Sequence, residues 1–552
     1  MIKNEEKATQ EYRAEKKATE AGLFGAVGQE HVEKATEILK KYKDAKTTLE
    51  NRIIDNEQWF KMRHWEQLRS GQSNDNASAW LFNSIANKHA DAMDNFPAVS
   101  VLPRESSDSR AAEILSQVLP VVFERNGFEK IYSDSWWYKL KAGTAVYGMF
   151  WNPLKSNGLG DIEIKQIDIL NLFWEPGIKD IQKSKNIFHV ELMDNDTLVS
   201  LYPQLKGKLG GSAVEISHYV YDDAVDTSNK TAVIDRYYKL IVNGVEQVHY
   251  MKFCAGELLY ASENDPLCRE RGFYDHGKYP FFFDTLFVEE GTPCGFGYID
   301  IMKDAQKQID MLSNALVRNA SMASNPRYFI NSAGAVNEEE FADWSNSFVH
   351  VAGSNLGEDS IREIRLSGIP EVYLGILNSK IDELKETSGN RDFSQGGVSS
   401  GVTAASAIAA LQEAGSKLTR DMVKSGYRAF SELNSLAVEL IRQFYDEPRF
   451  FRILGANGQQ EFIAYDNSAV KINTGKFGDE VYIRKPVFDI KVCAEKSSPF
   501  SKISQNELAL QLYSAGIFNP EMRSQAVMAL SLMDFEGKEQ VLQRITSEVV
   551  TL

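Results

Sequence analysis

Hydrophobic residues recur at helical spacing on either side of a short polar segment in the second half of the chain. Residues 371–388 carry apolar side chains three or four positions apart, and Gly389 follows as a plausible helix cap. Residues 389–402 are rich in Gly and Ser, which predicts a loop that can adopt several backbone conformations. The pattern therefore predicts a helix, an adjustable loop and a further helix.

The helix after the loop is unusually long. Its apolar stripe runs from about residue 403 to residue 446, a span of about 44 residues or roughly 65 Å. The stripe consists of Ile408, Leu411, Leu418, Met422, Phe430, Leu433, Leu440 and Phe444. Gly415, Ser416 and Gly426 lie within this helix and suggest bends. Two ordinary bundle helices joined by a flexible loop remain the alternative interpretation.

The first half of the chain changes from a helical to a strand pattern near Gly143. Residues 51–142 show the apolar steps of helices. The following segments alternate apolar and polar residues and turn at Gly or Asn-Gly, as antiparallel strands do. They are TAVYGMFWNP, GDIEIKQIDILNLFWEPG, NIFHVELM, HYVYDD, TAVIDRYYKLIVNGVEQVHYMKF and GELLYAS, with FFRILG, QQEFIAYD and YIRKPVFDIKVC further on. We therefore expect an α+β protein in which a helical layer precedes a β layer.

Composition limits the class of protein. A chain of 552 residues with 43% hydrophobic residues is long enough for about two to four domains with substantial cores. No run approaches the roughly 18 apolar residues of a membrane helix, and the charged N-terminus argues against a signal peptide. The four cysteines lack CxxC spacing, so we expect ordinary thiols and no metal.

The net charge of −16 excludes a protein that grips DNA tightly through its phosphates, because such proteins normally present a basic face. An acidic wall would still allow a duplex to slide past, since it repels phosphates at short range. The charge is therefore compatible with a conduit for DNA.

Known catalytic patterns are missing from the sequence. GxxxxGK[ST], HExxH and a GxGxxG that opens a βαβ unit do not occur, and the GxSxG letters at residues 397–401 lie in the Gly- and Ser-rich segment and do not follow a predicted strand. His64 lies among aromatic residues, and a packed or surface histidine explains it better than a general base. Trp136 and Trp137 interrupt a helical stripe, which favours core packing over base stacking. We expect a protein that is not an enzyme and needs no cofactor.

Residues 1–50 combine ten basic with ten acidic residues and many alanines. This balance predicts a charged helical arm that makes peripheral contacts and contributes no core element.

The order of these segments resembles the portal proteins of tailed bacteriophages, the head-to-tail connectors, and most closely the branch with a long N-terminal region. The resemblance covers residues 50–545. It rests on NSIANKHADAMDNFPAVSVLP, on SDSWWYKLKAGTAVYGMFWNP, on HGKYPFFFDTLFVEEGTPCGFGYIDIMKDAQKQIDMLSNALVRNASMASNP, and on the helix, loop and long helix described above. Relatives often have Ile-Asp-Pro and Asp-Pro where this chain has Ile167, Asp168 and Ile169, and Glu175 and Pro176, so these turns can differ in shape.

The resemblance implies a ring of commonly about twelve subunits at one capsid vertex. Its parts are a mixed α/β wing, a helical stem, a small α/β clip, a long kinked helix and a C-terminal helical crown. In this chain they correspond, after the arm at 1–50, to the wing at 51–296, the first stem helix at 297–325, the clip at 326–370, the second stem helix at 371–388, the tunnel loop at 389–402, the long wing helix at 403–446, a wing β segment at 447–499 and the crown at 500–552. Within the clip, RYFINS and FVHVAG predict strands around NEEEFADW.

Two sets of candidate site residues follow from the resemblance. The tunnel loop would face DNA with Arg391, Asp392, Phe393, Ser394, Gln395, Gly396, Gly397, Val398, Ser399 and Ser400. The clip would dock the packaging motor and adaptors with Glu338, Glu339, Glu340, Phe341 and Trp344. A local charge pair explains Arg391 and Asp392 as well as a phosphate contact does. The packing face predicted for the first stem helix consists of Ile301, Ala305, Gln308, Ile309, Leu312, Leu316 and Ala320.

The implied partners are further copies of the chain in a homo-oligomeric ring, non-specifically bound double-stranded viral DNA, the terminase large subunit, head-completion or tail adaptor proteins, and the major capsid protein, with scaffolding protein as a further candidate. A membrane is not among them. The implied location is the portal vertex of the virion, after assembly in the host cytoplasm. Two other functions stay open from the residues alone: a different connector or scaffold ring of the virion, and a hydrolase whose β region would hold the catalytic groups.

Overall fold

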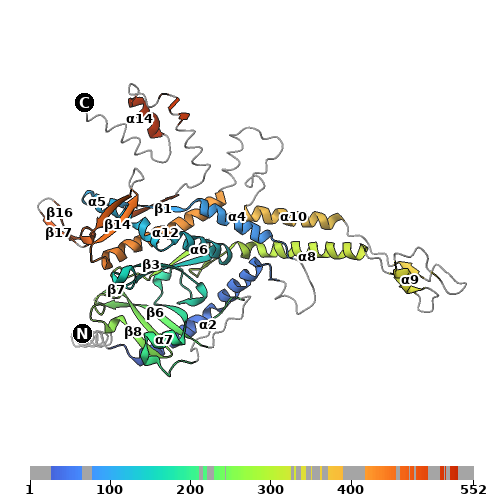
Figure 1. The fold of residues 1–552 in the computed structure, drawn as a ribbon, viewed down its shortest axis with the longest axis horizontal. Helices are drawn as coiled ribbons and strands as arrows, with labels where there is room; N and C mark the ends of the chain where they lie inside the picture. Colours follow the sequence, from blue (N-terminus) through green and yellow to red (C-terminus); the bar gives the residue numbers. More distant parts are fainter. Residues whose placement is uncertain are drawn as a thin grey trace, which may run out of the picture.

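The computed structural model describes most of the chain. The described residues are 26–64, 77–210, 216–220, 229–242, 244–324, 328–330, 337–343, 350, 361–363, 371–389, 417–454, 460–471, 473–477, 480–494, 510–511, 513–514, 516 and 523–532. Figure 1 shows a body of helices and sheets from which two long antiparallel helices project side by side. The fold class is α+β, as the sequence predicts.

The helices of the described residues are α2 (Gln29–Phe60), α4 (Trp80–Asp94), α5 (Ser109–Arg125), α6 (Phe128–Ala142), α7 (Asn195–Leu201), α8 (Tyr298–Ser324), α9 (Glu338–Ala342), α10 (Glu371–Ser388), α12 (Lys417–Phe444) and α14 (Arg523–Leu532). The strands of the body are β1 (Pro97–Pro103), β2 (Thr144–Asn152), β3 (Asp161–Ile167), β4 (Leu172–Trp174), β5 (Asn186–Asp194), β6 (Lys230–Val242), β7 (Val245–Cys254), β8 (Glu257–Ala261), β9 (Phe281–Thr285), β10 (Phe287–Val288), β11 (Gly295–Phe296) and β18 (Phe488–Ala494).

Two antiparallel sheets form the β layer of the body. The larger has the order β4-β5-β6-β7-β8 and the smaller the order β3-β2-β9. β6 and β7 pair from Val242 and Val245 outward, which confirms the hairpin predicted at the Asn-Gly pair. The strand predicted at HYVYDD is wrong for its described part, because residues 218–220 are not in a strand. This segment is held instead by side chains: the hydroxyls of Tyr219 and Tyr138 lie 2.6 Å apart, and both hydrogen-bond to Asp168.

Helix α2 corrects the prediction of a peripheral arm for residues 29–50, while residues 1–25 of the predicted arm lie outside the described residues. It runs through the expected boundary at residue 50 and continues to Phe60. Val32, Ala35 and Leu39 are buried on its inner face and form a core cluster with residues of the five-stranded sheet. Charge balance misled the prediction, because most charged residues of α2 occupy its solvent side while a narrow apolar stripe enters the core, and the paired Lys46 and Glu50 are buried as well.

The main core joins helices α4, α5, α6 and α12 to the three-stranded sheet. Trp136 of α6 is fully buried and Trp137 packs against the same cluster, so the prediction of core packing is confirmed for both. Gly143 ends α6 with a φ of 86°. A Cβ atom at this position would lie 2.3 Å from the backbone of Phe296, so this tight turn into β2 requires glycine.

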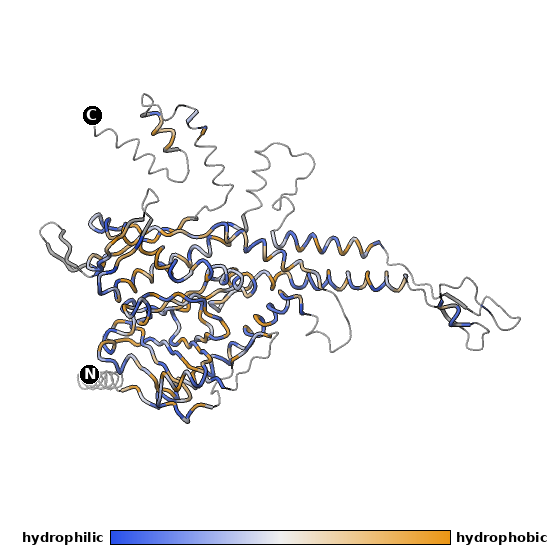
Figure 2. The backbone as a smooth tube through the Cα atoms, in the orientation of Figure 1, coloured by the Kyte–Doolittle hydropathy of each residue, from blue (hydrophilic) through white to orange (hydrophobic). Residues whose placement is uncertain are grey.

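Helices α8 and α10 form the projecting hairpin, called the stem here. The expected ends of the second stem helix are confirmed, since α10 spans Glu371–Ser388 and Gly389 follows with a φ of 70°. Figure 2 shows hydrophobic residues along both helices of the stem. Beyond Asp310 no residue of α8 is buried, and on α10 only Leu384 and Ser388 are. The outer stem therefore has little packing besides the contact between its two helices.

The packing face predicted for α8 is only partly right, since Ala305, Leu312 and Leu316 are partly buried. Ile309 is buried as expected, but Ile301 is 39% exposed, and Gln308 and Ala320 are exposed too. The buried side chains of this helix are Tyr298, Ile299, Met302, Gln306, Ile309 and Asp310. The prediction of a helix with one packing face was correct, but the face was placed with a rotation about the helix axis. Gln306 and Asp310, which the apolar pattern assigned to solvent, are buried.

The remaining described strands are short and lie at the stem tip or in the body. At the stem tip, β12 (Tyr328–Ile330) pairs with β13 (Ile361–Glu363). The strand expected at FVHVAG is described only at His350, which is not in a strand. β14 (Arg449–Leu454) pairs antiparallel with β15 (Gln460–Tyr465), which confirms the pairing of FFRILG with QQEFIAYD. Two strands, β16 (Asn473–Phe477) and β17 (Glu480–Arg484), form a second ribbon. Much of the expected crown lies outside the described residues.

Candidate functional site: the stem and the attachment of helix α12

The two sets of predicted site residues fall differently on the structure. The tunnel-loop residues 391–400 all lie outside the described residues, as does Trp344 of the clip. Glu338, Glu339, Glu340 and Phe341 belong to α9, at the far end of the stem (Figure 1). The structure therefore places four of the clip residues together on one short helix.

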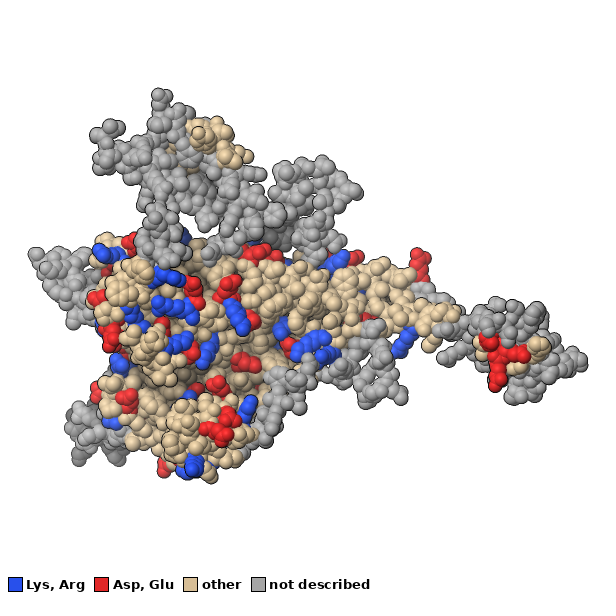
Figure 3. All heavy atoms as spheres, viewed as in Figure 1, with Lys and Arg blue, Asp and Glu red and all other residues tan. Residues whose placement is uncertain are grey.

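Helix α9 is stabilised by local hydrogen bonds. Asn337 caps it by accepting a hydrogen bond from the backbone N–H of Glu340. The Glu340 carboxylate accepts the backbone N–H of His350 at 2.6 Å and lies 2.9 Å from its Nδ1. These hydrogen bonds hold the pKa of Glu340 below its usual range. Figure 3 shows acidic side chains gathered at this tip, while the visible face of the body mixes both signs of charge.

The root of the stem is fixed by a buried polar cluster. Asp310 of α8 is fully buried, and its Oδ1 accepts hydrogen bonds from the Ser78 backbone N–H at 2.8 Å and from Gln306 Nε2 at 2.9 Å. Its Oδ2 lies 3.2 Å from Nε2 of His64. The His64 ring stacks on Trp59 with centroids 3.9 Å apart, so the prediction of a packed histidine is confirmed. The cluster ties residues 64 and 78 to one turn of the stem helix.

Helix α12 is the described part of the predicted long helix, whose residues 403–416 lie outside the described range. Its first turn is attached to α4. The Thr419 hydroxyl donates to Asp91 Oδ2 at 3.1 Å and accepts a hydrogen bond from Lys88 Nζ at 3.1 Å. Burial lowers the pKa of Lys88 and raises that of Asp91, because each charge loses hydration. This group is the first polar anchor of α12.

A buried ion pair forms the second anchor of α12. Lys139 of α6 and Asp284 of β9 are 0% and 2% exposed, and Nζ lies 2.6 Å from Oδ1. Nζ also donates to Ser425 Oγ at 3.1 Å, and the serine hydroxyl donates to the Thr285 carbonyl at 2.7 Å. Burial lowers the pKa of Lys139, while Asp284 opposes this effect. One hydroxyl of α12 thus completes the hydrogen bonding of a pair fixed in two other elements.

Gly426 lies next to this anchor and permits a close helix contact. A Cβ atom there would lie 2.8 Å from Cζ2 of the fully buried Trp136. The sequence pattern predicted a bend at Gly426. Close packing explains this glycine better, because the missing side chain makes room for the indole ring of Trp136. Lys139 Nζ lies 4.3 Å from the centroid of the same Trp136 ring.

The carboxyl end of α12 is also capped and attached. The Asn467 amide donates to the carbonyls of Ile441 and Arg442 at 3.1 Å each. Arg442 donates to the Pro486 carbonyl at 2.6 Å, which connects the helix to the segment before β18. Polar contacts therefore attach α12 to the body at both ends and in its first half.

Sequence reasoning missed Lys88, Lys139 and Asp284, because charged residues in amphipathic helices and strands are expected to face solvent. A signal existed for Lys139. It lies three residues after Trp136 in the same helix, so a helical projection places it on the face of this aromatic residue.

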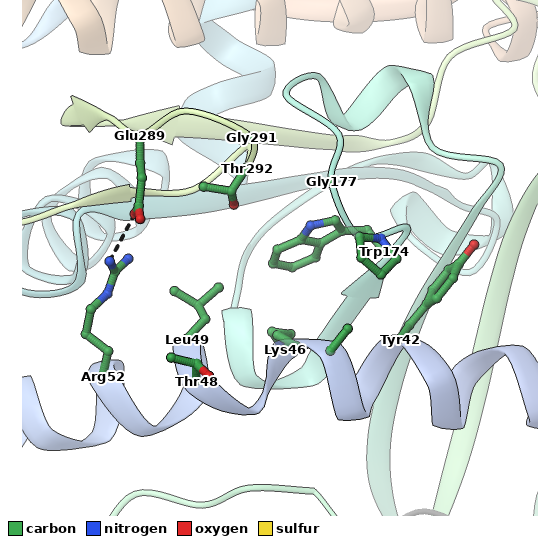
Figure 4. A pocket seen from close by; sticks show the side chains of 12 residues that line it. Tyr42, Lys46, Thr48, Leu49, Arg52, Trp174, Gly177, Glu289, Gly291 and Thr292 are labelled. Carbon is green, nitrogen blue, oxygen red and sulfur yellow. Dashed lines mark hydrogen bonds and ion pairs between the residues drawn. The ribbon is translucent and has the colours of Figure 1, made fainter.

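A hollow of about 290 Å³ lies between α2 and two loops of the β layer. Figure 4 shows the side chains that line it. Tyr42, Leu49 and Trp174 give it an apolar side. Arg52 reaches Glu289 at 3.0 Å and the Gly295 carbonyl at 2.7 Å, so its charge is balanced locally. Within the described ranges no group of three His, Cys, Asp or Glu side chains could hold a metal ion, and no helix there is apolar and long enough to cross a bilayer.

Comparisons with known proteins place these observations in a family. The virion of a native gene transfer agent particle contains a chain with 10% sequence identity and a TM-score of 0.38, and the match covers 81% of this chain and 88% of that chain. A search of curated proteins gave no match. The sequence profile of phage P22-like portal proteins matches residues 89–551. The chain therefore belongs to the P22-like portal protein family, a structural family without enzymatic activity.

Proposed function

We propose that this protein is a portal subunit that assembles into a ring at one capsid vertex, and that viral DNA is packaged, retained and ejected through the ring. The observation that carries the proposal is the uncovered stem. Four residues of α8 and four of α10 are large, apolar and at least 39% exposed: Ile301, Met311, Val317, Met322, Val372, Tyr373, Leu374 and Ile376. A two-helix hairpin cannot cover such side chains by itself, and neighbouring stems in a ring would cover them.

The stem tip supports the second part of the proposal, the docking of other virion proteins. α9 and the β12–β13 pair lie at the end of the stem farthest from the body (Figure 1). In a ring of parallel stems, these elements would form one rim. We propose that this rim binds the terminase large subunit during packaging and the adaptor proteins of the tail afterwards. The body would contact the capsid protein, and hydrolysis of ATP would belong to the terminase.

The tunnel loop at 389–402 would face the DNA at the inner side of the stem. Gly389 ends α10, and the described chain resumes at Lys417 in α12. Ser394, Gln395 and Phe393 could contact a sliding duplex without reading bases, while Arg391 and Asp392 pair with each other or touch phosphates. The anchors of α12 would carry the resulting load to α4, α6 and β9.

Electron microscopy of the purified protein tests the ring. We expect end views, averaged without imposed symmetry, to show about twelve subunits around a hole wide enough for duplex DNA. The exposed apolar stem is the physical reason, since its burial between subunits stabilises the ring. A protein that stays monomeric at all concentrations would contradict the proposal and return attention to the other interpretations of the sequence.

Deletion of residues 391–400 tests the tunnel loop. We expect the deleted protein to form normal rings and to support less DNA packaging or retention in a packaging assay, because the deletion removes the proposed DNA contact and leaves the stem faces intact. The double variant Arg391→Ala/Asp392→Ala is the control that separates a phosphate contact from a local charge pair. Normal packaging by rings that carry the deletion would remove the assignment of this loop.

A further inference from the structure

Three residues along α12 contact partners at fixed positions in the body. Thr419 fits between Lys88 and Asp91, Ser425 completes the Lys139–Asp284 pair, and Gly426 lies against Trp136. The partners come from three different elements, α4, α6 and β9. From this arrangement we infer that Lys139, Asp284 and Trp136 act as a register lock, which fixes the position of α12 along its own axis.

A shift of α12 by one turn would break every one of these matches. Long helices can move past their neighbours in steps of one turn, about 5.4 Å, because equivalent ridges then meet the same grooves. After such a shift the position of Ser425 would be taken by Ala429 or by Asp421. Alanine offers no hydroxyl to the buried pair, and aspartate would place a second carboxylate beside Asp284.

A shift of α12 by one turn is also unfavourable at Gly426, for a steric reason. One turn to either side stand Met422 and Phe430, both buried and both large. A Cβ atom at this position would already lie 2.8 Å from the Trp136 ring. Trp136 is fully buried in the core and has no room to move away. Hydrogen bonding and sterics therefore favour the same single register.

The apolar contacts of α12 do not fix the register as sharply. Its buried residues Val423, Leu433, Leu436, Ala437 and Leu440 recur at helical spacing, and a shift by one turn would replace one aliphatic residue by another at several positions. A buried ion pair is weak evidence for stability, since apolar residues of similar volume can replace such a pair at little cost. Specifying one register is the better-supported role for Lys139 and Asp284.

Only the mechanical meaning of the lock rests on the proposed function. If α12 follows a loop that contacts DNA, a load on its amino end would pass into α4, α6 and β9, because the helix cannot slide. Lys139, Asp284 and Ser425 are positioning residues in this scheme.

The test reads the register by cross-linking on the purified full-length protein without DNA. Glu439 of α12 lies 2.7 Å from Lys485, and both side chains are partly exposed. In a Cys493→Ser background, which removes an exposed thiol, the pair Glu439→Cys/Lys485→Cys reports the native register under a short thiol cross-linker. The pair Gln443→Cys/Lys485→Cys reports a helix displaced by one turn.

We expect the first pair to dominate in the otherwise native protein. The substitution Lys139→Met with Asp284→Leu should leave the thermal midpoint close to that of the parent and lower the ratio of the two cross-linking yields. Ser425→Ala, which removes a single hydroxyl, should lower the same ratio by about three- to tenfold. If the double variant fails to fold, Ser425→Ala alone decides the question. Neither variant touches the cross-linked positions.

Ser435→Ala is the matched control, because among the described residues the Ser435 hydroxyl hydrogen-bonds only to the Ser431 carbonyl of the same helix. A ratio in the Lys139 and Ser425 variants equal to that of Ser435→Ala would overturn the lock, whatever their stability. The outcome is independent of the ring: a changed ratio in a protein that forms no ring would keep the lock and contradict the portal proposal, while rings with an unchanged ratio would do the reverse.

Discussion

Replacing Asp310 by alanine is expected to lower the free energy of local opening of α8 at the stem root by about 3–5 kcal/mol. The carboxylate is fully buried and accepts hydrogen bonds from the Ser78 backbone and Gln306, and it also contacts His64. Alanine leaves these polar groups without the acceptor that offsets their lost hydration. Hydrogen exchange of the amides of residues 299–312 measures the effect, since opening of this part of α8 exposes them to solvent.

Two substitutions sharpen this experiment. Asp310→Asn retains an oxygen acceptor of the same size, so we expect a smaller loss of about 1–2 kcal/mol. Asp304→Ala removes a carboxylate from an exposed position of the same helix and should change the exchange rates little. Exchange in Asp310→Ala as slow as in Asp304→Ala would show that the buried cluster does not hold the stem.

The expected result for Asp310 depends on a feature that the sequence pattern did not show. The resemblance to portal proteins implied a helix at 297–325, within one residue of the observed ends, and the spacing of apolar residues assigned its packing face. The same pattern placed Gln308 on the packing face, where the structure has Gln306 and Asp310 buried instead. The local sequence pattern is enough to predict that a helix forms. Which face of the helix is buried depends on the polar groups that find partners in distant segments, such as residues 64 and 78.

The β layer was predicted well where local chemistry determines it. The tight turn at Gly143 accepts only glycine, because a Cβ atom would collide with the Phe296 backbone. The Asn-Gly pair closes the hairpin between β6 and β7. The expected strand at residues 218–223 is wrong for its described residues 218–220, because alternation alone cannot distinguish a strand from a segment held by tyrosine hydroxyls. Here Tyr219 bonds to Asp168, and Ser217 donates to Glu50 of α2.

The site was predictable only in outline. The order of helix, loop and long helix indicated the portal family, and the family profile over residues 89–551 confirms it. The anchors of α12 were not predicted, because they join residues up to 331 positions apart in the sequence. A single sequence contains no signal for such pairings beyond charged residues on a helix face, which usually mark solvent.

A second large effect is expected in the segment for which the sequence prediction was wrong. Leu39 of α2 is fully buried against the five-stranded sheet, together with Phe173, Phe188 and Phe253. Leu39→Ala should therefore lower the free energy of unfolding by about 2–5 kcal/mol, through lost burial and the cavity that remains. Chemical denaturation of the full-length protein measures the loss, and hydrogen exchange should locate it in β5, β6 and β7.

The neighbouring residue provides the control for this prediction. Lys40 is exposed on the same turn of α2, and Lys40→Ala should stay within about 0.5 kcal/mol of the parent protein. The comparison separates two roles for residues 26–50. A peripheral charged arm would tolerate both substitutions equally, whereas a helix that forms part of the core tolerates only the second. Equal stability of the two variants would restore the arm that the balanced charges predict, because burial of the apolar stripe would then contribute nothing to folding.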